Sequence, residues 1–189
     1  MTDSLRPYSL ANHFLIAMPS LEDSFFADSV VFLCDHTADG AMGVVINKPS
    51  PLTMDIIFDG AKLPTPTRFH GKQVLIGGPV QLDHGFLLHS PAGSWDSSFL
   101  VAEDMALTAS RDIVTGLTLD DKVDKALVTL GLSSWAPGQL EKELAENAWL
   151  AAPADRRIIF DLPYEERYQA AIKLLHVSPA QLIGSGGHA

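Results

Sequence analysis

A cysteine and a histidine two residues apart are the side chains best placed to do chemistry in this chain. Cys34 is the single cysteine, and it ends the apolar run 30–34, with His36 just beyond it. On a strand this spacing puts both side chains on one face, where a thiolate–imidazolium pair could support nucleophilic catalysis or redox sensing. The alternative is a small buried hydrophobe followed by a strand-end histidine. We favour the alternative, because a nucleophile also needs solvent access and an oxyanion hole.

Four histidines, at positions 36, 70, 84 and 89, could in principle meet around a metal ion. No two of them form a close pair, and the five-residue spacing of His84 and His89 puts them on opposite faces of a strand. The single cysteine excludes an internal disulfide and an all-cysteine zinc site. We therefore expect no metal and no other cofactor.

Two glycine-containing segments, 40–49 and 77–79, could let a ligand approach the backbone. Neither matches a P-loop or a dinucleotide fingerprint, and Gly-Gly-Pro is typical of a plain turn. The alternative is a pocket for a small ligand. Its polar groups and its glycines would be Asn47, Lys48, Gly77, Gly78 and His89.

The stretch 130–150 carries two tryptophans around a predicted helix over 139–149. Trp135 and Gln139 could form part of a partner-binding surface, since tryptophan is enriched at binding hot spots. Tryptophan at a strand–helix junction is also an ordinary core anchor, and we favour that interpretation. The glutamates of the helix are expected on its solvated face. They are Glu141, Glu143 and Glu146.

The pattern of apolar runs and turn signals predicts strands and helices in mixed order. Strands are expected at 14–17, 30–34, 42–46, 74–76, 85–89, 99–102, 126–132 and 158–160, and helices at 21–27, 53–58, 111–116, 139–149 and 161–175. Asp39-Gly40 predicts a hairpin turn between the second and third strands. Because strands cluster early and do not alternate regularly with helices, we expect an α+β fold with a largely antiparallel sheet flanked by helices.

The length and charge of the chain indicate its domain organisation and the partners it can bind. A chain of 189 residues is expected to form a single domain over 1–189, with 1–9 and the glycine-rich 184–189 flexible. Acidic residues number 23 against 13 lysines and arginines, a formal charge of −10. Basic residues are scattered, so we expect no direct nucleic-acid binding.

The compartment is expected to be the cytoplasm. No apolar stretch approaches the ~20 residues that span a bilayer, and we expect no membrane association. The first residues show no secretory signal, because Asp3 precedes an apolar run, 14–18, that is too short for one.

Several segments together resemble the YqgE/AlgH family of bacterial proteins, over about residues 10–189. They are 14–19, 25–31, 34–36, 40–49, 77–80, 85–89, 135–149 and 187–189. The resemblance implies an α+β fold whose bent sheet forms a pseudo-barrel. Members of that family lack an established biochemical activity, and some carry the label of transcriptional regulator.

Three functions stay open at this point. The first is a non-enzymatic regulatory or interaction protein that acts through a protein partner or a small ligand, with any regulatory role indirect because of the acidic charge. The second is a thiol-based enzyme or redox sensor that uses Cys34 and His36. The third is a regulator that binds DNA directly. We favour the first.

Overall fold

The computed structural model describes residues 9–22, 25–119 and 122–175. In these ranges ten strands form one sheet, ordered β10-β1-β2-β3-β9-β6-β8-β7, with β5 attached to β9 and β4 attached to β5. The strands are β1 (His13–Ala17), β2 (Val30–Thr37), β3 (Gly40–Val45), β4 (Pro49–Thr53), β5 (Gln73–Ile76), β6 (Val80–Ser90), β7 (Ser98–Ala102), β8 (Met105–Thr108), β9 (Lys125–Trp135) and β10 (Trp149–Pro153).

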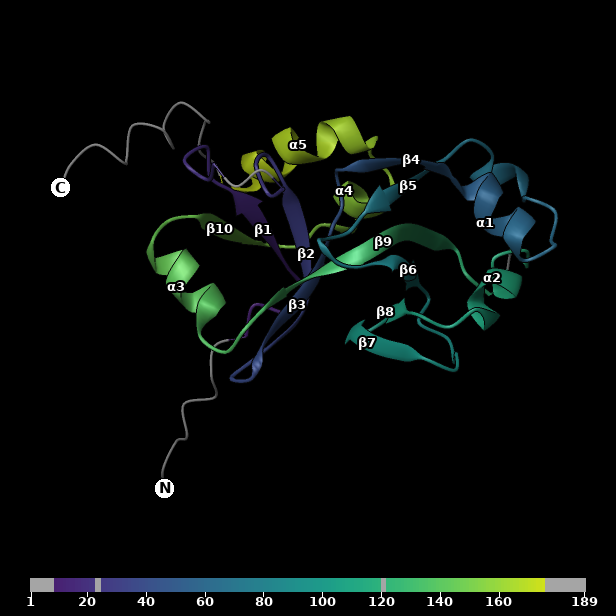
Figure 1. Cartoon of the computed structure of the whole chain (residues 1–189), viewed down its shortest axis with the longest axis horizontal. Helices are drawn as coiled ribbons and strands as arrows, with labels where there is room; N and C mark the ends of the chain where they lie inside the picture. The colour runs from purple at the N-terminus through teal and green to yellow at the C-terminus, as the bar shows by residue number, and fades with distance from the viewer. Residues whose placement is uncertain (1–8, 23–24, 120–121, 176–189) are drawn as a thin grey trace, which may run out of the picture.

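The sheet is almost wholly antiparallel, with β5 and β9 as its parallel pair. β9 joins its two halves, because its last residues pair with β3 and its first residues pair with β6 (Figure 1). The expected α+β class and antiparallel sheet are confirmed, and the hairpin turn at Asp39-Gly40 joins β2 to β3. The sheet does not close into a barrel: among the described residues, β7 and β10 each have a neighbour on one side alone.

Short helices cover the two ends and one side of the sheet. The α-helices are α1 (Met54–Gly60), α2 (Asp112–Gly116), α3 (Gln139–Ala145), α4 (Arg156–Phe160) and α5 (Arg167–Leu174), and the 3-10 turns are η1 (Thr67–Phe69) and η2 (Tyr164–Glu166). In Figure 1, α3 lies at one end, α1 and α2 lie at the other, and α4 and α5 lie above the sheet. No helix in the described ranges is long and apolar enough to cross a membrane.

Three apolar clusters divide the core. The largest joins the sheet to α4 and α5 and includes Phe32 and Ile159. A second lies under α3 and includes Leu33, Trp135 and Trp149, and a third lies under α1 and α2. Successive residues of β2 thus enter different clusters, so both faces of this strand are buried. This is why its sequence is continuously apolar instead of alternating.

The strand predicted over 158–160 is wrong, because these residues belong to α4. Asp155 caps this helix, since its side chain accepts a hydrogen bond of 2.9 Å from the backbone N–H of Arg157. Ile158 and Ile159 are both buried, as one face of a short helix and not as a strand. Three apolar residues in a row cannot distinguish the two structures.

Other expected boundaries also change, and the helix predicted over 161–175 becomes the 3-10 turn η2 followed by α5. The helix predicted over 139–149 ends at Ala145, because Asn147 takes a left-handed backbone conformation (φ 59°) and Trp149 begins β10. The described part of the predicted helix at 21–27 forms turns and irregular chain. Three strands, β4, β8 and β10, had no expected counterpart.

Candidate functional site

Cys34 and His36 lie on opposite faces of β2, so the expectation that they share a face is wrong. The pairing of β2 with β3 shifts register between Leu33 and Asp35, which marks a β-bulge at Cys34. Cys34 packs into the core cluster beneath α4 and α5. His36 instead contacts Glu141 of α3 on the other side of the sheet, with Nε2 and Oε1 2.6 Å apart. One extra residue in the strand removes the predicted thiol–imidazole pair.

The environment of Cys34 keeps its thiol protonated and shielded. The residue is 1% exposed, and its Sγ donates to the carbonyl of Phe32 at 3.7 Å. Burial, and secondarily the charge of Asp35, raises the pKa of the Cys34 thiol. Reactive cysteines are exposed and have a lowered pKa, so nothing in this geometry supports thiol chemistry.

His36 ties three parts of the chain together. Its Nδ1 accepts a hydrogen bond of 2.9 Å from the backbone N–H of Leu10, which leaves Nε2 to donate to Glu141. That hydrogen bond lowers the pKa of the Glu141 carboxyl. His36 thus joins the segment before β1 and helix α3 to β2, which is a structural task.

The buried Trp135 and the exposed Gln139 both take part in the contacts that join α3 to the end of β9. Trp135 is 5% exposed and stacks on Phe26, with ring centroids 6.1 Å apart. Gln139 accepts from the backbone N–H of Ala136 at 3.0 Å and donates to Glu143 at 3.2 Å. Glu143, expected on the solvated face, instead accepts from the indole of Trp135 at 2.7 Å. These contacts place both predicted surface residues in the support of the strand–helix junction.

Asn47 and Lys48 support the chain just after β3. The side chain of Asn47 donates to the carbonyl of Asp28 at 2.8 Å and accepts from the backbone N–H of Val30 at 2.9 Å. The ammonium of Lys48 lies 4.5 Å from the ring centroid of Phe25. Both residues hold the segment that leads into β2, and neither lines the two cavities described below.

The two predicted ligand-approach glycines face β9 instead of a ligand. A Cβ atom at Gly77 would lie 2.5 Å from the carbonyl oxygen of Gly131, and one at Gly78 would lie 2.0 Å from Leu132. The hydroxyl of Ser133 also donates to the carbonyl of Gly77 at 3.0 Å. Glycine is therefore needed here because two segments of backbone touch.

His89 is fully buried and away from both glycines. Its Nε2 lies 2.7 Å from the Thr108 hydroxyl and its Nδ1 lies 3.0 Å from the carbonyl of Pro91. Burial lowers the pKa of this imidazole, although the bond to Pro91 opposes the shift. The structure therefore brings Lys48 beside Gly77, since the backbone N–H of Ile76 donates to the Lys48 carbonyl at 2.8 Å, but it leaves His89 apart from them.

The four histidines considered as metal ligands each have a different polar partner. His36 is bonded to Glu141, and His89 to Thr108. The other two pairs are His70 with Asp55 and His84 with Asp83. Within the described residues, no group of three or more potential ligands is close enough to hold a metal.

We give the name β7 edge surface to the exposed apolar side chains of β7 and of the first residues of β6. In the described part of the chain, six large hydrophobic side chains are exposed, and four of them lie on β6 and β7. These four define the surface: Val80, Leu82, Phe99 and Leu100, with exposed fractions of 38%, 51%, 42% and 62%. At the other end of the sheet the side chains of β10 are mostly buried or half-buried. β7 is thus the less protected edge.

A groove of about 210 Å³ runs beside the β7 edge surface. Its apolar lining is Met42, Phe86, Phe99, Leu107, Ala109 and Leu132, and Ser97 and Ser98 complete it. Its residues come from β3, β9, β6, β8 and β7, so the groove crosses one face of five neighbouring strands. Val80 pairs directly with Leu132, so β6 extends the same apolar face. Phe99 belongs to both features and joins the exposed edge to the groove.

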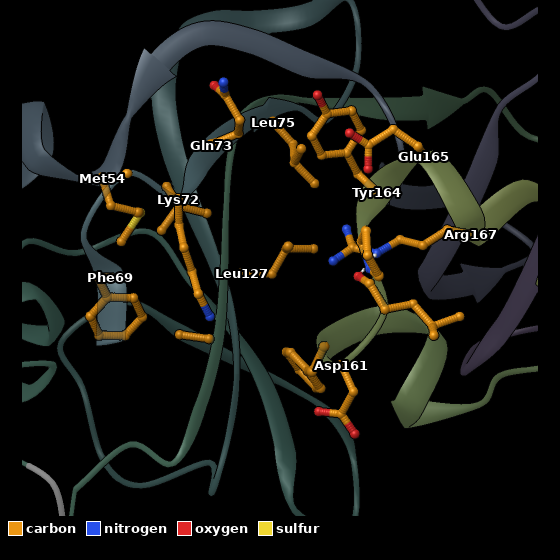
Figure 2. Close-up of a pocket in the computed structure, with 16 residues that line it drawn as sticks. Met54, Phe69, Lys72, Gln73, Leu75, Leu127, Asp161, Tyr164, Glu165 and Arg167 are labelled. Carbon is orange, nitrogen blue, oxygen red and sulfur yellow. Dashed lines mark hydrogen bonds between the residues drawn. The ribbon is translucent and has the colours of Figure 1, made fainter. Parts of the chain in front are cut away.

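A larger cavity of about 360 Å³ lies elsewhere, between β5, β9 and the segment 160–167 (Figure 2). No residue predicted from the sequence as a functional site lines it. Its most unusual member, Arg167, is the first residue of α5 and is 6% exposed. One weak signal for its burial is its spacing, since Arg167 precedes the small apolar residue Ala171 by four positions and so shares a helix face with it.

These features define an α+β protein on an open, mostly antiparallel sheet with two candidate binding regions. The chain belongs to the AlgH-like family, whose model matches residues 14–180. A UPF0301 protein from Neisseria meningitidis serogroup C is 52% identical over 181 residues, covering 96% of this chain and all of that one. A UPF0301 protein from Laribacter hongkongensis is 51% identical over 185 residues, 95% of this chain and 97% of the relative.

Solved structures agree with this assignment. The solution structure of the AlgH protein from Pseudomonas aeruginosa is 42% identical, has a TM-score of 0.77 and covers 97% of each chain. The crystal structure of protein DIP2367 from Corynebacterium diphtheriae has a TM-score of 0.63 at 22% identity, over 77% of this chain and 76% of that one, so the likeness concerns the fold alone. The names of these relatives state no reaction.

Proposed function

We propose that this protein is a non-enzymatic cytoplasmic interaction protein that binds a protein partner along the β7 edge surface. The observation that carries the proposal is the pair Phe99 and Leu100. They lie next to each other on an end strand, so their side chains point to opposite faces, and both are substantially exposed. Exposed apolar area on an edge strand is unfavourable in water and is usually covered or blunted.

The occupant that fits is an extended segment of the partner. Such a segment can pair with the free backbone groups of β7 and insert alternate apolar side chains into the groove beside Phe99. Acidic residues lie at both ends of β7, with Asp96 before it and Glu103 and Asp104 after it. Charge complementarity therefore favours a partner segment with lysine or arginine on either side of its apolar core.

The same acidic charge argues against direct DNA contact. The formal charge of −10 repels phosphate, and basic residues are scattered along the chain. A role in gene regulation would then pass through the protein partner. This agrees with the expectation that any regulatory effect is indirect.

Affinity capture from the native bacterial lysate, with nuclease present, tests the proposal when wild type is compared with two lysine variants. Leu100→Lys places a charge on the edge strand, whereas Ile56→Lys places the same charge on α1, where Ile56 is 50% exposed. We expect one stoichiometric protein to be retained by wild type and by Ile56→Lys and to be lost by Leu100→Lys. Circular dichroism should show all three folded.

Two outcomes would overturn the proposal. One is equal retention of the partner by Leu100→Lys and wild type, which would place the interface elsewhere. The other is that wild type retains no stoichiometric protein. If Leu100→Lys does not fold, Phe99→Ser replaces it, because Phe99 borders the groove and its loss leaves β7 paired to β8.

A further inference from the structure

The cavity between β5, β9 and the segment 160–167 is separate from the β7 edge surface. No residue of that surface lines it, and its volume of about 360 Å³ is in the range of small-molecule sites. Much of its wall is apolar. The large apolar residues of this wall include Met54, Phe69, Leu75, Leu127, Phe160 and Leu162.

Arg167 supplies a buried positive charge to this cavity. Its Nε donates to the carbonyl of Leu162 at 3.2 Å, and its Nη1 donates to the carbonyl of Ile46. A guanidinium has five N–H groups, so these two bonds leave three for other acceptors. In the described ranges, no carboxylate oxygen lies within 4 Å of it. Figure 2 shows its nitrogens directed toward the centre of the cavity, near Leu127.

A buried, positively charged Arg167 makes the binding of an anion in the cavity energetically favourable. Burial lowers the pKa of Arg167 to about 10, although the charge of Glu165 opposes the shift, so the group stays charged at neutral pH in a place where charge is unfavourable. Its two present acceptors are neutral carbonyls. A buried charge is normally paired with an opposite charge, and a carboxylate would complete that pairing by accepting two parallel N–H bonds.

The other charged groups on the wall do not cancel this preference. Lys72 lies across the cavity from Arg167, with Leu127 between them (Figure 2). Asp161 is already paired, because the Nζ atom of Lys125 lies 2.9 Å from its Oδ1. Glu165 is exposed, so water screens its charge. Lys72 is exposed as well, so water screens both of these charges, and the buried Arg167 is the dominant charge on the wall.

We propose that this cavity binds a small organic carboxylate, with its carboxylate on Arg167 and its apolar body against Leu127 and the wall toward Met54. Arg167 discriminates by charge, and the apolar wall selects a ligand with a hydrocarbon or aromatic part. Lys72 adds positive potential from the facing wall. The cavity does not include the β7 edge surface, so a test of carboxylate binding is independent of a test of partner binding.

Three probes with the same hydrocarbon chain test this site: octanoate, octanol and octylamine. Isothermal titration measures their affinities, and amide chemical shifts locate them on the protein. We expect octanoate to bind at least about tenfold more tightly than octanol, since a hydrogen bond to a charged group is worth that factor or more. Octylamine should bind most weakly, and the shifts should centre on 72–75, 126–128 and 160–167.

Two variants separate a ligand contact from a merely structural role of Arg167. Ala126→Trp puts a large side chain on the β9 wall of the cavity, leaves Arg167 itself unchanged, and should abolish octanoate binding. Arg167→Met should abolish the preference for octanoate over octanol. If Arg167→Met does not fold, Lys72→Glu replaces it, because Lys72 is exposed and the opposite charge should weaken octanoate binding severalfold.

Several results would overturn the proposal. Equal binding of octanol and octanoate would make Arg167 a tether between α5 and the end of β3 and nothing more. Octanoate binding that survives Ala126→Trp would place the ligand elsewhere. Absence of saturable octanoate binding would remove the site. None of these results would alter the retention of a partner by the β7 edge surface.

Discussion

Trp135 and Trp149 donate their indole N–H groups to the same carboxylate oxygen, Oε2 of Glu143, at 2.7 Å and 3.0 Å. The two indoles meet edge to face, with centroids 6.1 Å apart, and are 5% and 2% exposed. One residue of α3 thus ties the end of β9 to the start of β10. Core anchoring, the interpretation favoured from the sequence over a binding surface, is thus confirmed for these tryptophans.

The first prediction concerns the stability that Trp135 contributes. Trp135→Ala removes a buried aromatic side chain and should lower the free energy of unfolding by ~3–5 kcal/mol. Urea denaturation followed by circular dichroism measures the change. A variant that keeps its stability but loses a bound protein would place Trp135 on a functional surface instead.

A second prediction concerns Glu143, the acceptor that the two indoles share. Glu143→Ala leaves both buried indole N–H groups without a hydrogen-bond acceptor. The free energy of unfolding should therefore fall by roughly 1–3 kcal/mol for each indole. Glu146→Ala is the matched control on the same helix: its ion pair with Lys142 is 3.9 Å long and exposed, and its loss should change stability by less than about 0.5 kcal/mol. Equal effects of the two substitutions would contradict a special role for Glu143.

A third prediction concerns stability at mildly acid pH. Burial lowers the pKa of His89 in the folded protein below its ordinary value of 6.5, so the unfolded chain binds a proton more readily. The contribution of neutral His89 is fully present above pH 6.5. It is lost as the pH falls below 6.5 toward the folded-state pKa, by no more than about 1.4 kcal/mol per pH unit.

The measurement is a series of urea denaturations between pH 7.5 and pH 5, on wild type and on His89→Gln. The variant is expected to be less stable at neutral pH, because the hydrogen bonds of His89 with Thr108 and Pro91 are perturbed. Below pH 6.5 its stability should fall less steeply than that of wild type. Parallel pH profiles would mean that His89 does not titrate differently in the two states.

The sequence predicted the sheet well, because its strands are apolar runs between clear turn signals. Val30–Cys34 is buried on both faces, and Asp39-Gly40 forms the expected hairpin. The helix α4 could not be predicted in the same way. Its short apolar run has the length of a strand, and its cap, Asp155, gives a signal that many loops also carry.

The candidate sites were harder to predict than the fold, for two physical reasons. A β-bulge at Cys34 changes the face of every later residue in β2, and no local signal in the sequence marks it. The Arg167 cavity is assembled from segments near residues 72, 127 and 167, so no spacing along the chain reveals it. A sequence identifies residues with reactive side chains, such as Cys34, but it does not show which residues are buried. Arg167 is unusual because it is a buried arginine.

A fourth prediction concerns the reactivity of Cys34. Because the thiol is buried and its pKa is raised, a thiol-reactive dye should label the native protein slowly near neutral pH, and urea should make labelling fast. The labelling rate measured against urea concentration should follow the unfolding curve. Rapid labelling of the native protein would revive a thiol-based function.

The last prediction separates close packing from ligand binding at the glycines of 77–79. Gly78→Ala puts a methyl group 2.0 Å from the carbonyl group of Leu132, so the strands must move apart. Overpacking of this kind typically costs 1–3 kcal/mol or more, and the cost should appear in the free energy of unfolding measured with urea. A ligand-contacting glycine in open space would instead accept the methyl group and lose only the ligand.

Gly85→Ala is the matched control in the neighbouring strand. No atom lies within 4 Å of the position that its Cβ would take, and alanine is favoured over glycine within a strand by roughly 0.5–1 kcal/mol. The two substitutions should therefore have opposite signs: Gly85→Ala neutral to stabilising and Gly78→Ala clearly destabilising. If Gly78→Ala is as stable as Gly85→Ala, β9 does not press against Gly78, and the space over Gly78 becomes available to a ligand after all.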